Sequence, residues 1–587
     1  MTAPYGRGSE RWVLPTTDCH AVESLARELK ITAPAARALV ARGLSDPARA
    51  RAFLNPRLEE LHDPLGLRDM ARAAERLEAA IRAGEKILVY GDYDVDGTTS
   101  VALLMKALEA AGGAPSWHVP HRLKDGYGMR AEPVEAAAAR GVKLIVSVDT
   151  GIRAAEVVRR AAELGIDVIV TDHHLPESDL PPALAVLNPN RPDCSYPEKN
   201  LCGAGVAFKL AQALLARMGW PAARLGRISE SFLKIVALAT VADVVPLTGE
   251  NRVIVKHGLA GLRSVRNPGL RALLDVAGFA AGSEPTSRQV GFQIAPRINA
   301  AGRMDTAETV IELFLTADAG RAAELARQLD RQNAERQQVE AEIREACERT
   351  PADESAAALV YYDPAWHRGV LGIVASRMVE RFHRPAFVIG LNPDDGMAQG
   401  SGRSIPAFPL LDALDSMRDL FARYGGHSHA AGVTLDPARV PEFRERLNAC
   451  AAARLRPEDF APAVSIDALV ALPEIDEDAA RDVCALAPFG YGNPQPVFAA
   501  LDVEVAGPPV VWSEKHLRVL VRRNGRTLAL KAWNFAARAA EFTTGAHLDV
   551  AFTLEDDPYS AARGYPGWCA VLKEARAAGQ GREAAAG

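Results

Sequence analysis

The chain has little cysteine and no long hydrophobic run. Its seven cysteines are an odd number, are widely scattered and form no CxxC pair, which argues against a disulfide framework and against a zinc-thiolate site. No apolar run approaches the ~20 residues that a helix needs to cross a bilayer. The start, MTAPYGRGSERW, has no basic segment followed by an apolar core, so it does not predict a secretory signal. We therefore expect reduced cysteines, no membrane span and a cytoplasmic protein.

Charge of one sign is not in large excess either. The chain has 68 Lys and Arg against 74 Asp and Glu, a net charge of -6. This total does not exclude nucleic acid as a partner, because an acidic metal site can outweigh a local basic groove in the sum. The 587 residues are several times a domain of about 100 to 200 residues, which predicts three or four folded cores.

Short β-branched runs alternate with Ala-rich helical segments between residues 86 and 243. The predicted strands are KILVYGD, VKLIVSVDTG, IDVIVTDHH and ALAVLNPN. Strand, helix and strand repeated in this way predict an α/β fold with a parallel sheet. Ligand sites in such sheets lie outside the carboxyl ends of the strands. Polar residues that end these strands are therefore expected to share one site.

The stretch VYGDYDVDG places Asp92, Asp94 and Asp96 at alternate positions directly after the first strand. An EF-hand calcium loop begins with the same spacing, but it needs a Glu at its twelfth position, where this chain has Leu103, and a helix before it. A solvated acidic turn is the other alternative, and it leaves the position after a strand unexplained. A metal site is the better interpretation.

Further acids and imidazoles end the next predicted elements: Asp149, Asp172, His173, His174 and Asp243. Any one of them alone is more often a cap or a satisfied core residue. Together, carboxylates with a few imidazoles suit Mn²⁺ or Mg²⁺, and the ligands suffice for two ions bridged by a shared Asp. Two such ions can activate a water and hold both the attacking and the leaving oxygen of a phosphoester. Phosphoester hydrolysis is the predicted chemistry.

The remaining chain divides into further predicted parts. Residues 321–349 contain no Pro or Gly and are densely charged, which predicts a long, solvent-exposed connecting helix. Alternating strands around Asn524-Gly525 predict a β-hairpin in a small all-β unit. We predict this division: an N-terminal segment at 1–48, an α/β catalytic domain at 49–315, the connecting helix at 316–351, a second α/β domain at 352–455, the all-β domain at 460–575 and a disordered tail at 576–587.

Basic motifs predict how a phosphate-bearing substrate is held. Candidates for substrate binding are Arg122 in PHRLKDGYG, Arg297, Asn299 and Arg303 in RINAAGRMD, Ser401 and Arg403 in GSGRS, and His427 in GGHSHAAG. Arginine forks suit bidentate phosphate contacts, and flexible glycines permit close backbone approach. The alternative is that some of these arginines pair with acids. His427 and His429 could form a metal pair, but their loop context argues against it.

A basic hairpin in the all-β unit predicts contacts with a nucleic-acid backbone. Its candidates are Arg518, Arg522, Arg523, Arg526 and Lys531. Trp512 and Trp533 lie nearby in the sequence, and basic residues interleaved with aromatics fit a groove that also stacks bases. Tryptophans are more often core residues, so the aromatic part stays open at this point.

The motifs resemble a known family. GDYDVDG, SVDTG, VTDHH and ATVADVVPL resemble the four successive motifs of the DHH phosphoesterase superfamily. LNPRLEELHDPLGLRDM, PHRLKDGYGM, RINAAGRMD, GSGRS and GGHSHAAG resemble those of RecJ-type single-strand-specific exonucleases. The resemblance implies a DHH domain with the parallel sheet, a DHHA1-like second α/β domain and an OB-fold in the all-β unit.

The resemblance also implies roles for single residues. Metal ligands would be Asp94, Asp96, Asp149, His173 and Asp243, with Asp149 as the bridge. Asp92 and His174 would act beside the metals together with Asp149, and His174 would contact the scissile phosphate. Ser401 and Arg403 would bind a terminal 5′-phosphate, and His427 would face the metals. The chain departs from related pyrophosphatases at Tyr90, where they carry a histidine.

These inferences predict a cytoplasmic, Mn²⁺- or Mg²⁺-dependent exonuclease that degrades single-stranded DNA from the 5′ end to 5′-mononucleotides. The family implies repair and recombination, with a helicase and a single-strand-binding protein as partners. One alternative is a related phosphodiesterase for small nucleotides or short oligonucleotides. The other is a single-strand-binding scaffold without catalytic activity.

Overall fold

The computed structural model describes residues 11–350 and 356–579. The start of the chain and most of the predicted tail at 576–587 lie outside the described residues. The chain forms two compact units, one spanning Leu58–Phe460 and the other combining Met1–Arg57 with Ala461–Gly587. None of the described helices is both long enough and apolar enough to span a membrane.

The Leu58–Phe460 unit contains the predicted parallel sheet. Its strand order is β3-β2-β4-β5-β6 and every pairing is parallel, which confirms the α/β fold. The strands are β2 (Lys86–Tyr90), β3 (Pro115–His118), β4 (Val142–Val148), β5 (Asp167–Thr171) and β6 (Ala185–Leu187). The sequence analysis missed the short, polar β3, because PSWH lacks the β-branched run that marks its neighbours.

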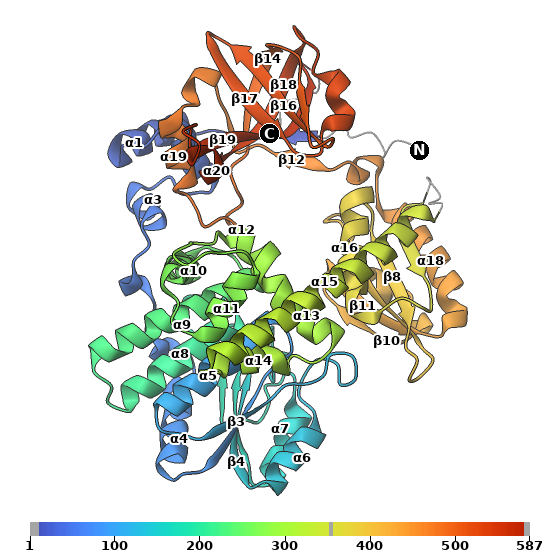
Figure 1. Cartoon of the computed structure of the whole chain (residues 1–587). Coiled ribbons are helices and arrows are strands. Elements are labelled where there is room, and N and C mark those ends of the chain that lie inside the picture. The colour runs from blue at the N-terminus through green and yellow to red at the C-terminus, as the bar shows by residue number, and fades with distance from the viewer. Residues whose placement is uncertain (1–10, 351–355, 580–587) are drawn as a thin grey trace. The chain divides into compact units, whose positions relative to one another are not determined.

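Helices cover both faces of this sheet because successive strand residues point to opposite sides. Ile87 and Val89 belong to one core cluster, whereas Leu88 and Tyr90 belong to another. The first cluster includes α4 (Met70–Arg82), α5 (Val95–Ala110) and α8 (Gly203–Arg217), and the second includes α6 (Ala131–Ala139) and α7 (Ala155–Glu163). Figure 1 shows α6 and α7 beside β4.

The rest of the first α/β domain is helical and leads into the long helix. The helices are α9 (Ala222–Ala242), α10 (Gly249–Gly261), α11 (Pro268–Val276), α13 (Ala295–Met304), α14 (Glu308–Leu315) and α15 (Ala319–Arg349). The 31-residue α15 confirms the predicted helix, but it is not simply a solvent-exposed connector. It buries Ala322, Leu325, Ala326, Leu329, Asn333, Arg336, Glu340, Ile343 and Cys347. Its apolar residues extend two separate cores.

The second α/β domain has a mixed sheet in the order β10-β11-β9-β8-β7. Its elements are β7 (Leu359–Tyr362), α16 (Leu371–Phe382), β8 (Ala386–Leu391), β9 (Ala398–Arg403), α17 (Leu410–Asp415), β10 (Phe421–Gly426), β11 (Ala430–Leu435) and α18 (Val440–Arg454). The glycines of GSGRS lie inside β9, not in the flexible segment expected from the sequence. A Cβ on Gly402 would lie 2.3 Å from the Phe387 ring, so close packing requires glycine here.

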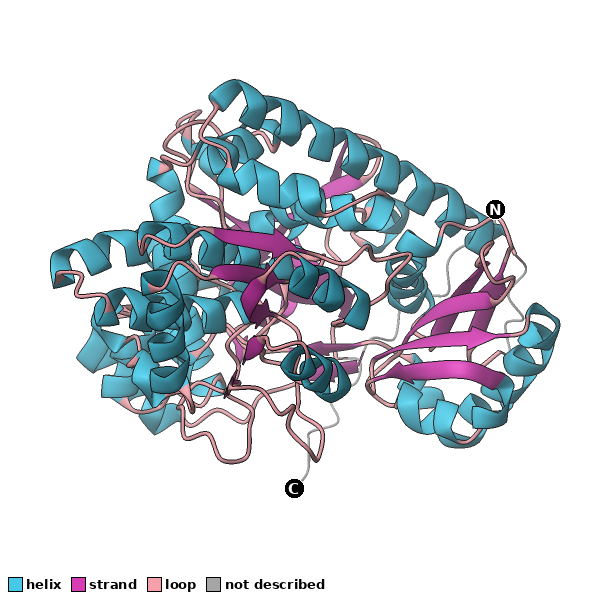
Figure 2. Cartoon of the chain, turned by 90° about the horizontal axis from the view of Figure 1, so that it is seen from below, coloured by secondary structure: helices cyan, strands magenta, loops and turns pink. Residues whose placement is uncertain are grey.

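The all-β unit is closed by an extra pairing. Its strand order is β13-β14-β18-β19-β17-β16-β15, and β14 also pairs with β16, as in a small barrel. The strands are β13 (Ala468–Leu469), β14 (Phe498–Val505), β15 (Val510–Trp512), β16 (His516–Arg523), β17 (Arg526–Ala532), β18 (His547–Asp556) and β19 (Trp568–Ala577). Asn524 and Gly525 form the predicted hairpin turn, both with positive φ. Figure 2 distinguishes the strands from the helices by colour.

The first helices of the chain pack on this all-β unit. They are α1 (Cys19–Leu29), α2 (Ala33–Ala41) and α3 (Pro47–Leu54). Leu25 and Leu39 share a core with Phe498 and Phe552. The predicted boundary at residue 48 falls inside α3, since nothing local in the sequence marks a contact between segments more than 400 residues apart.

Candidate metal centre

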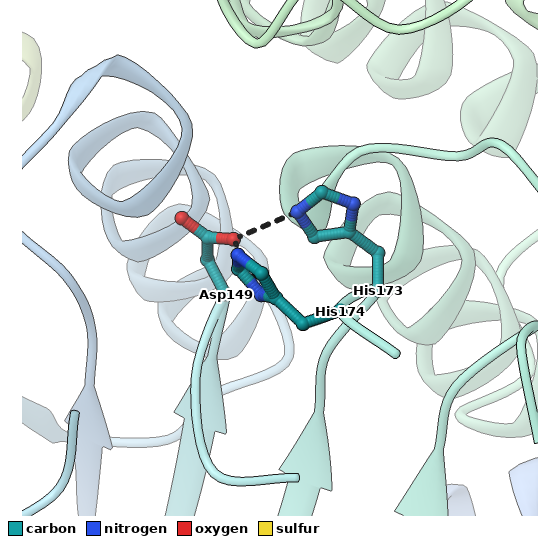
Figure 3. A group of neighbouring side chains, drawn as sticks. All are labelled: Asp149, His173 and His174. Carbon is teal, nitrogen blue, oxygen red and sulfur yellow. Dashed lines mark ion pairs between the residues drawn. The ribbon is translucent and has the colours of Figure 1, made fainter. Parts of the chain in front are cut away.

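The predicted metal ligands come from the carboxyl ends of adjacent strands. Asp92, Asp94 and Asp96 follow β2, Asp149 follows β4, and His173 and His174 follow β5. Asp243 caps the carboxyl end of α9. The parallel order of the sheet therefore brings together the residues from Asp92 to His174, and helix α9 adds Asp243. Figure 3 shows Asp149 facing both histidines.

His173 lies at the middle of the cluster. Its Nε2 is 3.2 Å from Asp149 Oδ1, 3.6 Å from Asp243 Oδ2 and 3.7 Å from Asp96 Oδ2. In each of three overlapping groups, one ligand atom per residue lies within 4.8 Å of the others: Asp96, His173 and Asp243; Asp92, Asp94 and Asp149; and Asp149, His173 and His174. Asp149 and His173 each belong to two of these groups.

Four polar atoms in this cluster are buried without a hydrogen-bond partner. They are Asp92 Oδ1, Asp149 Oδ1, His173 Nε2 and Asp243 Oδ2. Buried polar atoms in folded proteins are almost always satisfied, so each exception needs an explanation. Carboxylate oxygens and an imidazole nitrogen that converge without partners suit a hard or borderline divalent cation such as Mn²⁺ or Mg²⁺. The residues fit the predicted metal.

The electrostatics of the cluster agree with this assignment. Burial, followed by the neighbouring carboxylates, raises the pKa of Asp149 well above its usual value. Burial and the charges of Asp96 and Asp94 raise the pKa of Asp243 to about 9. Burial also lowers the pKa of His173, which favours the neutral imidazole that can act as a ligand. Without a cation, the carboxylates repel one another and hold protons more tightly.

The backbone positions these ligands at some cost. Asp149 has a φ of +58°, a conformation that is uncommon outside glycine and concentrates at functional sites. A Cβ on Gly203 would lie 2.6 Å from Asp149 Cβ, so only glycine fits at the start of α8. The amides of Gly203 and Ala204 donate to the two carboxylate oxygens of Asp96, which anchors that side chain at the helix N-terminus.

Asp172 positions His174, a role that the sequence analysis did not assign. Its carboxylate accepts hydrogen bonds from the amides of Ile152, His173 and His174, and it lies 2.7 Å from His174 Nδ1. Burial opposes the charged imidazole, but the hydrogen bond with Asp172 outweighs it and raises the pKa of His174. The signal was its place in VTDHH, immediately before the two histidines.

Three of the predicted substrate arginines converge beside this centre. Arg122 lies over the Tyr93 ring at 4.7 Å. Arg303 Nη1 donates to Gly369 O at 3.0 Å, and Arg403 Nη1 donates to Ser401 Oγ at 3.1 Å. Across residues 11–350 and 356–579, no ion pair joins these three to a carboxylate. Arg297 differs, because it pairs with Asp330 at 2.9 Å.

The three arginines repel one another. Burial, followed by the charges of Arg122 and Arg336, lowers the pKa of Arg303, and Arg403 adds to the effect while Asp94 opposes it. Burial and then Arg122 lower the pKa of Arg403. An arginine stays charged at neutral pH, so this cluster is stabilised when an anion binds among the guanidinium groups.

Comparison with known proteins explains this combination of metal ligands and arginines. The DHH family N-terminal domain matches residues 86–240, the DHHA1 domain matches 355–453 and the RecJ OB domain matches 466–564. The chain is 40% identical over 480 residues to the single-stranded-DNA-specific exonuclease RecJ of Dickeya dadantii (strain 3937), covering 78% of this chain and 81% of that protein. This chain belongs to the RecJ family.

Other RecJ proteins extend the similarity to nearly the whole chain and to the metal. RecJ of Bacillus subtilis (strain 168) is 37% identical over 545 residues, covering 92% of this chain and 68% of that protein. The crystal structure of RecJ from Thermus thermophilus in complex with Mn²⁺ superposes with a TM-score of 0.82 at 33% identity, covering 96% of this chain and 79% of that chain.

The structure also gives the local surroundings of two other predicted site residues of this RecJ chain, Asn299 and His427, and of Tyr90. Asn299 Oδ1 accepts a hydrogen bond from Val95 N at 3.2 Å, so Asn299 supports the loop that carries the three aspartates. His427 lies in the exposed turn between β10 and β11. Tyr90 is fully buried, and its hydroxyl accepts a hydrogen bond from Arg130 N at 3.2 Å.

Most of the basic hairpin residues in the RecJ OB domain already have partners. Arg522 pairs with Glu504, Arg523 with Asp502 and Lys531 with Asp557, and Arg526 donates to the Ile475 carbonyl. Arg518 is exposed. Trp512 and Trp533 pack edge to face with centroids 5.6 Å apart, and Trp533 remains 48% exposed. Arg518 and Trp533 thus remain exposed, whereas Arg522, Arg523 and Lys531 already form ion pairs with carboxylates.

Metal binding is expected to stabilise the protein more as the pH rises. The folded protein holds a proton on Asp243 up to a pKa of about 9, far above the pKa of an unfolded Asp. The folded state therefore binds more protons than the unfolded state between about pH 4 and pH 9, and the free energy of unfolding of the metal-free protein falls as pH rises through that window. Bound cation removes this penalty and adds about 2.7 kcal/mol at a hundredfold excess over its Kd.

Thermal unfolding at pH 6.0 and pH 8.5, with chelator and with Mn²⁺, checks this expectation. The increase in Tm caused by Mn²⁺ should be larger at pH 8.5. An increase that is equal at the two pH values, or larger at pH 6.0, contradicts the assignment of the carboxylate cluster.

Proposed function

We propose that the chain is a metal-dependent exonuclease that hydrolyses single-stranded DNA from the 5′ end to 5′-mononucleotides. The observation that carries this proposal is the pairing of two features: converging ligand atoms without partners, and three converging arginines without carboxylates. The first fits divalent cations, and the second fits phosphate. Because the two features lie close together, they fit a DNA strand whose terminal phosphate binds the arginines while the neighbouring scissile phosphate lies at the metals.

Two ions are accommodated by the overlapping ligand groups. We assign one to Asp96, His173 and Asp243 and the other to Asp92 and Asp94, with Asp149 shared. Bound Mn²⁺ or Mg²⁺ would supply Lewis-acid chemistry, lowering the pKa of a water and neutralising charge on the phosphate oxygens. Asp172 holds Nδ1 of His174, which leaves Nε2 to contact the scissile phosphate. The amides at the start of α8 keep Asp96 in place.

The arginine cluster is assigned to the 5′-phosphate. Ser401 and Arg403 lie on β9 against the start of α16, where a Cβ on Gly372 would lie 2.9 Å from Ser401 Oγ and 3.0 Å from Arg403 Nη2. This close approach leaves the helix amides and the guanidinium near one another. A terminal phosphate has a second ionisable oxygen that an internal phosphodiester lacks, so a cationic pocket favours it.

The alternatives fit the structure less well. A catalytically inactive scaffold has no need for four buried ligand atoms without partners. A phosphodiesterase for small nucleotides has no need for the all-β unit with its exposed Arg518 and Trp533. Family membership alone supports the further proposal that the enzyme acts in repair and recombination with a helicase and a single-strand-binding protein.

The test uses one long single-stranded DNA labelled separately at its 5′ and 3′ ends. With Mn²⁺ or Mg²⁺, the 5′ label should appear first as a mononucleotide, while chelator should abolish release. Early release of the 3′ label, internal cleavage, or turnover of dinucleotides alone would each overturn the proposal. Binding without cleavage under any metal would favour the scaffold.

A further inference from the structure

One exposed aromatic side chain lies directly on the metal centre and has no assigned role. Tyr127 belongs to the loop at residues 120–130, between β3 and α6. Its hydroxyl is 3.1 Å from His174 Nδ1, 3.4 Å from His174 Nε2 and 3.5 Å from the backbone oxygen of Asp149. Its ring packs edge to face with His174, with the centroids 5.5 Å apart. The Tyr127 residue is nevertheless 53% exposed. Its ring is therefore fixed at one end and open to solvent elsewhere.

The loop holds Tyr127 in this position through several contacts. Gly126 and Gly128 flank it with φ values of +77° and +101°, which only glycine adopts readily. Asp125 Oδ2 accepts a hydrogen bond from His121 N at 2.7 Å. At the end of the loop, Arg130 N donates to the Tyr90 hydroxyl. The exposed Tyr127 ring therefore lies in a constrained loop. Tyr90, a buried residue of β2, anchors the end of this loop.

Two other exposed apolar residues adjoin the metal ligands. Leu175 follows His174 and is 61% exposed, and Val244 follows Asp243 and is 64% exposed with a φ of +59°. Single exposed apolar residues are ordinary, but several beside one site indicate an interaction surface. This surface borders the ligands that would hold the scissile phosphate. We therefore expect it to contact the apolar part of the same DNA strand. That part is the nucleobase.

We propose that Tyr127 contacts an unpaired nucleobase next to the scissile phosphate and so contributes to the selection of single-stranded substrate. This inference rests on the proposed exonuclease function. Every base has a π face, so stacking on an aromatic ring is tolerant of sequence. In a duplex these faces are covered by neighbouring base pairs, and the base cannot reach the ring without unpairing. The contact of the hydroxyl with the His174 ring keeps Tyr127 beside the reacting phosphate.

A second interpretation is that Tyr127 only supports His174. The two interpretations differ in their dependence on the base. A supporting hydroxyl affects every substrate equally, whereas a base contact has an effect only where the base is present. Removing the base from the substrate therefore separates them, and this comparison does not depend on how a variant changes the loop.

The experiment measures kcat/KM of wild type, Tyr127→Leu and Tyr127→Phe on two strands of the same length. One strand is normal, and in the other the two 5′-terminal nucleotides carry stable tetrahydrofuran abasic sites. Loss of a stacking contact is expected to lower kcat/KM about 10-fold, both for wild type on the abasic strand and for Tyr127→Leu on the normal strand. On the abasic strand, Tyr127→Leu should lie within about 2-fold of wild type.

The controls decide between the outcomes. Tyr127→Phe keeps the ring and should retain at least about a third of wild-type kcat/KM on the normal strand. Leu65→Ser removes another exposed apolar side chain, 60% exposed in the turn before α4, and should change turnover of neither substrate. An equal loss on both strands for Tyr127→Leu overturns the base contact. Absence of wild-type turnover on the normal strand would instead refute the exonuclease proposal itself.

Discussion

Replacing Asp149 by Asn is expected to lower the rate of DNA hydrolysis by about 10³-fold or more. Asp149 belongs to two of the three ligand groups and contributes a buried oxygen without a hydrogen-bond partner. Losing the shared charge weakens the binding of both proposed ions. Metal ions supply several kcal/mol of transition-state stabilisation. About 4 kcal/mol corresponds to about 10³-fold in rate.

Asn is the informative replacement at this position. It keeps the volume beside Gly203 and tolerates the φ of +58°, whereas Ala would add backbone strain. The replacement also removes a buried carboxyl whose charged form is disfavoured by burial and by the neighbouring carboxylates, which together raise its pKa, so the metal-free variant should melt no lower than wild type. The stabilisation by Mn²⁺ should largely disappear.

Initial rates on 5′-labelled DNA and Tm values with and without Mn²⁺ test this prediction. Asp275→Asn serves as the matched control, since it removes an exposed carboxylate that pairs with Arg271 on the same helix. A variant that keeps more than about a tenth of the wild-type rate would contradict the bridging role of Asp149.

Replacing Arg403 by Met is expected to lower the preference for a 5′-phosphorylated end over a 5′-hydroxyl end, measured as the ratio of kcat/KM values, by about 10²-fold. Arg403 has no carboxylate partner among the described residues, and it lies beside Ser401 and the start of α16. A bidentate contact with phosphate comprises two charge-assisted hydrogen bonds of about 1.5 kcal/mol or more each, which together correspond to about 10²-fold. Methionine keeps the apolar stem and the packing while removing the charge.

The measurement compares kcat/KM on strands that differ only in a 5′-phosphate or a 5′-hydroxyl. Wild type should have the higher kcat/KM on the 5′-phosphorylated strand. Arg403→Met should lower kcat/KM on that strand alone, so that its values on the two strands become nearly equal. Arg446→Met is the control, because Arg446 is an arginine of the same domain that pairs with Asp419. Equal losses on both ends would show a general role in backbone binding instead.

Residues at strand ends were predicted well because their signal is local. Apolar β-branched runs mark β2, β4 and β5, and the acids and histidines follow them directly in the sequence. A parallel sheet places all carboxyl ends at one edge. The meeting of Asp92, Asp149 and His173 therefore follows from the strand pattern without knowledge of any side-chain contact.

The roles of basic residues were predicted less well, because charge in a sequence does not reveal its partner. Arg297 and Arg303 stand six positions apart in one motif, yet Arg297 pairs with Asp330 whereas Arg303 joins Arg122 and Arg403. In the hairpin, Arg522 and Lys531 are matched by acids from outside the hairpin. These pairings depend on cross-strand register and on helix packing, which link distant parts of the chain.

The class of fold, the candidate metal ligands and the family could be inferred from the sequence alone, since all three depend on patterns within about ten neighbouring residues. The folded structure was needed to show which arginines lack an acidic partner among residues 11–350 and 356–579, that helices α1 to α3 pack on the all-β unit, and that Tyr127 reaches His174. Each of these depends on contacts between segments far apart in the chain. Such contacts arise only when the packed elements bring side chains within a few ångströms, because hydrogen bonds and ion pairs act over that range.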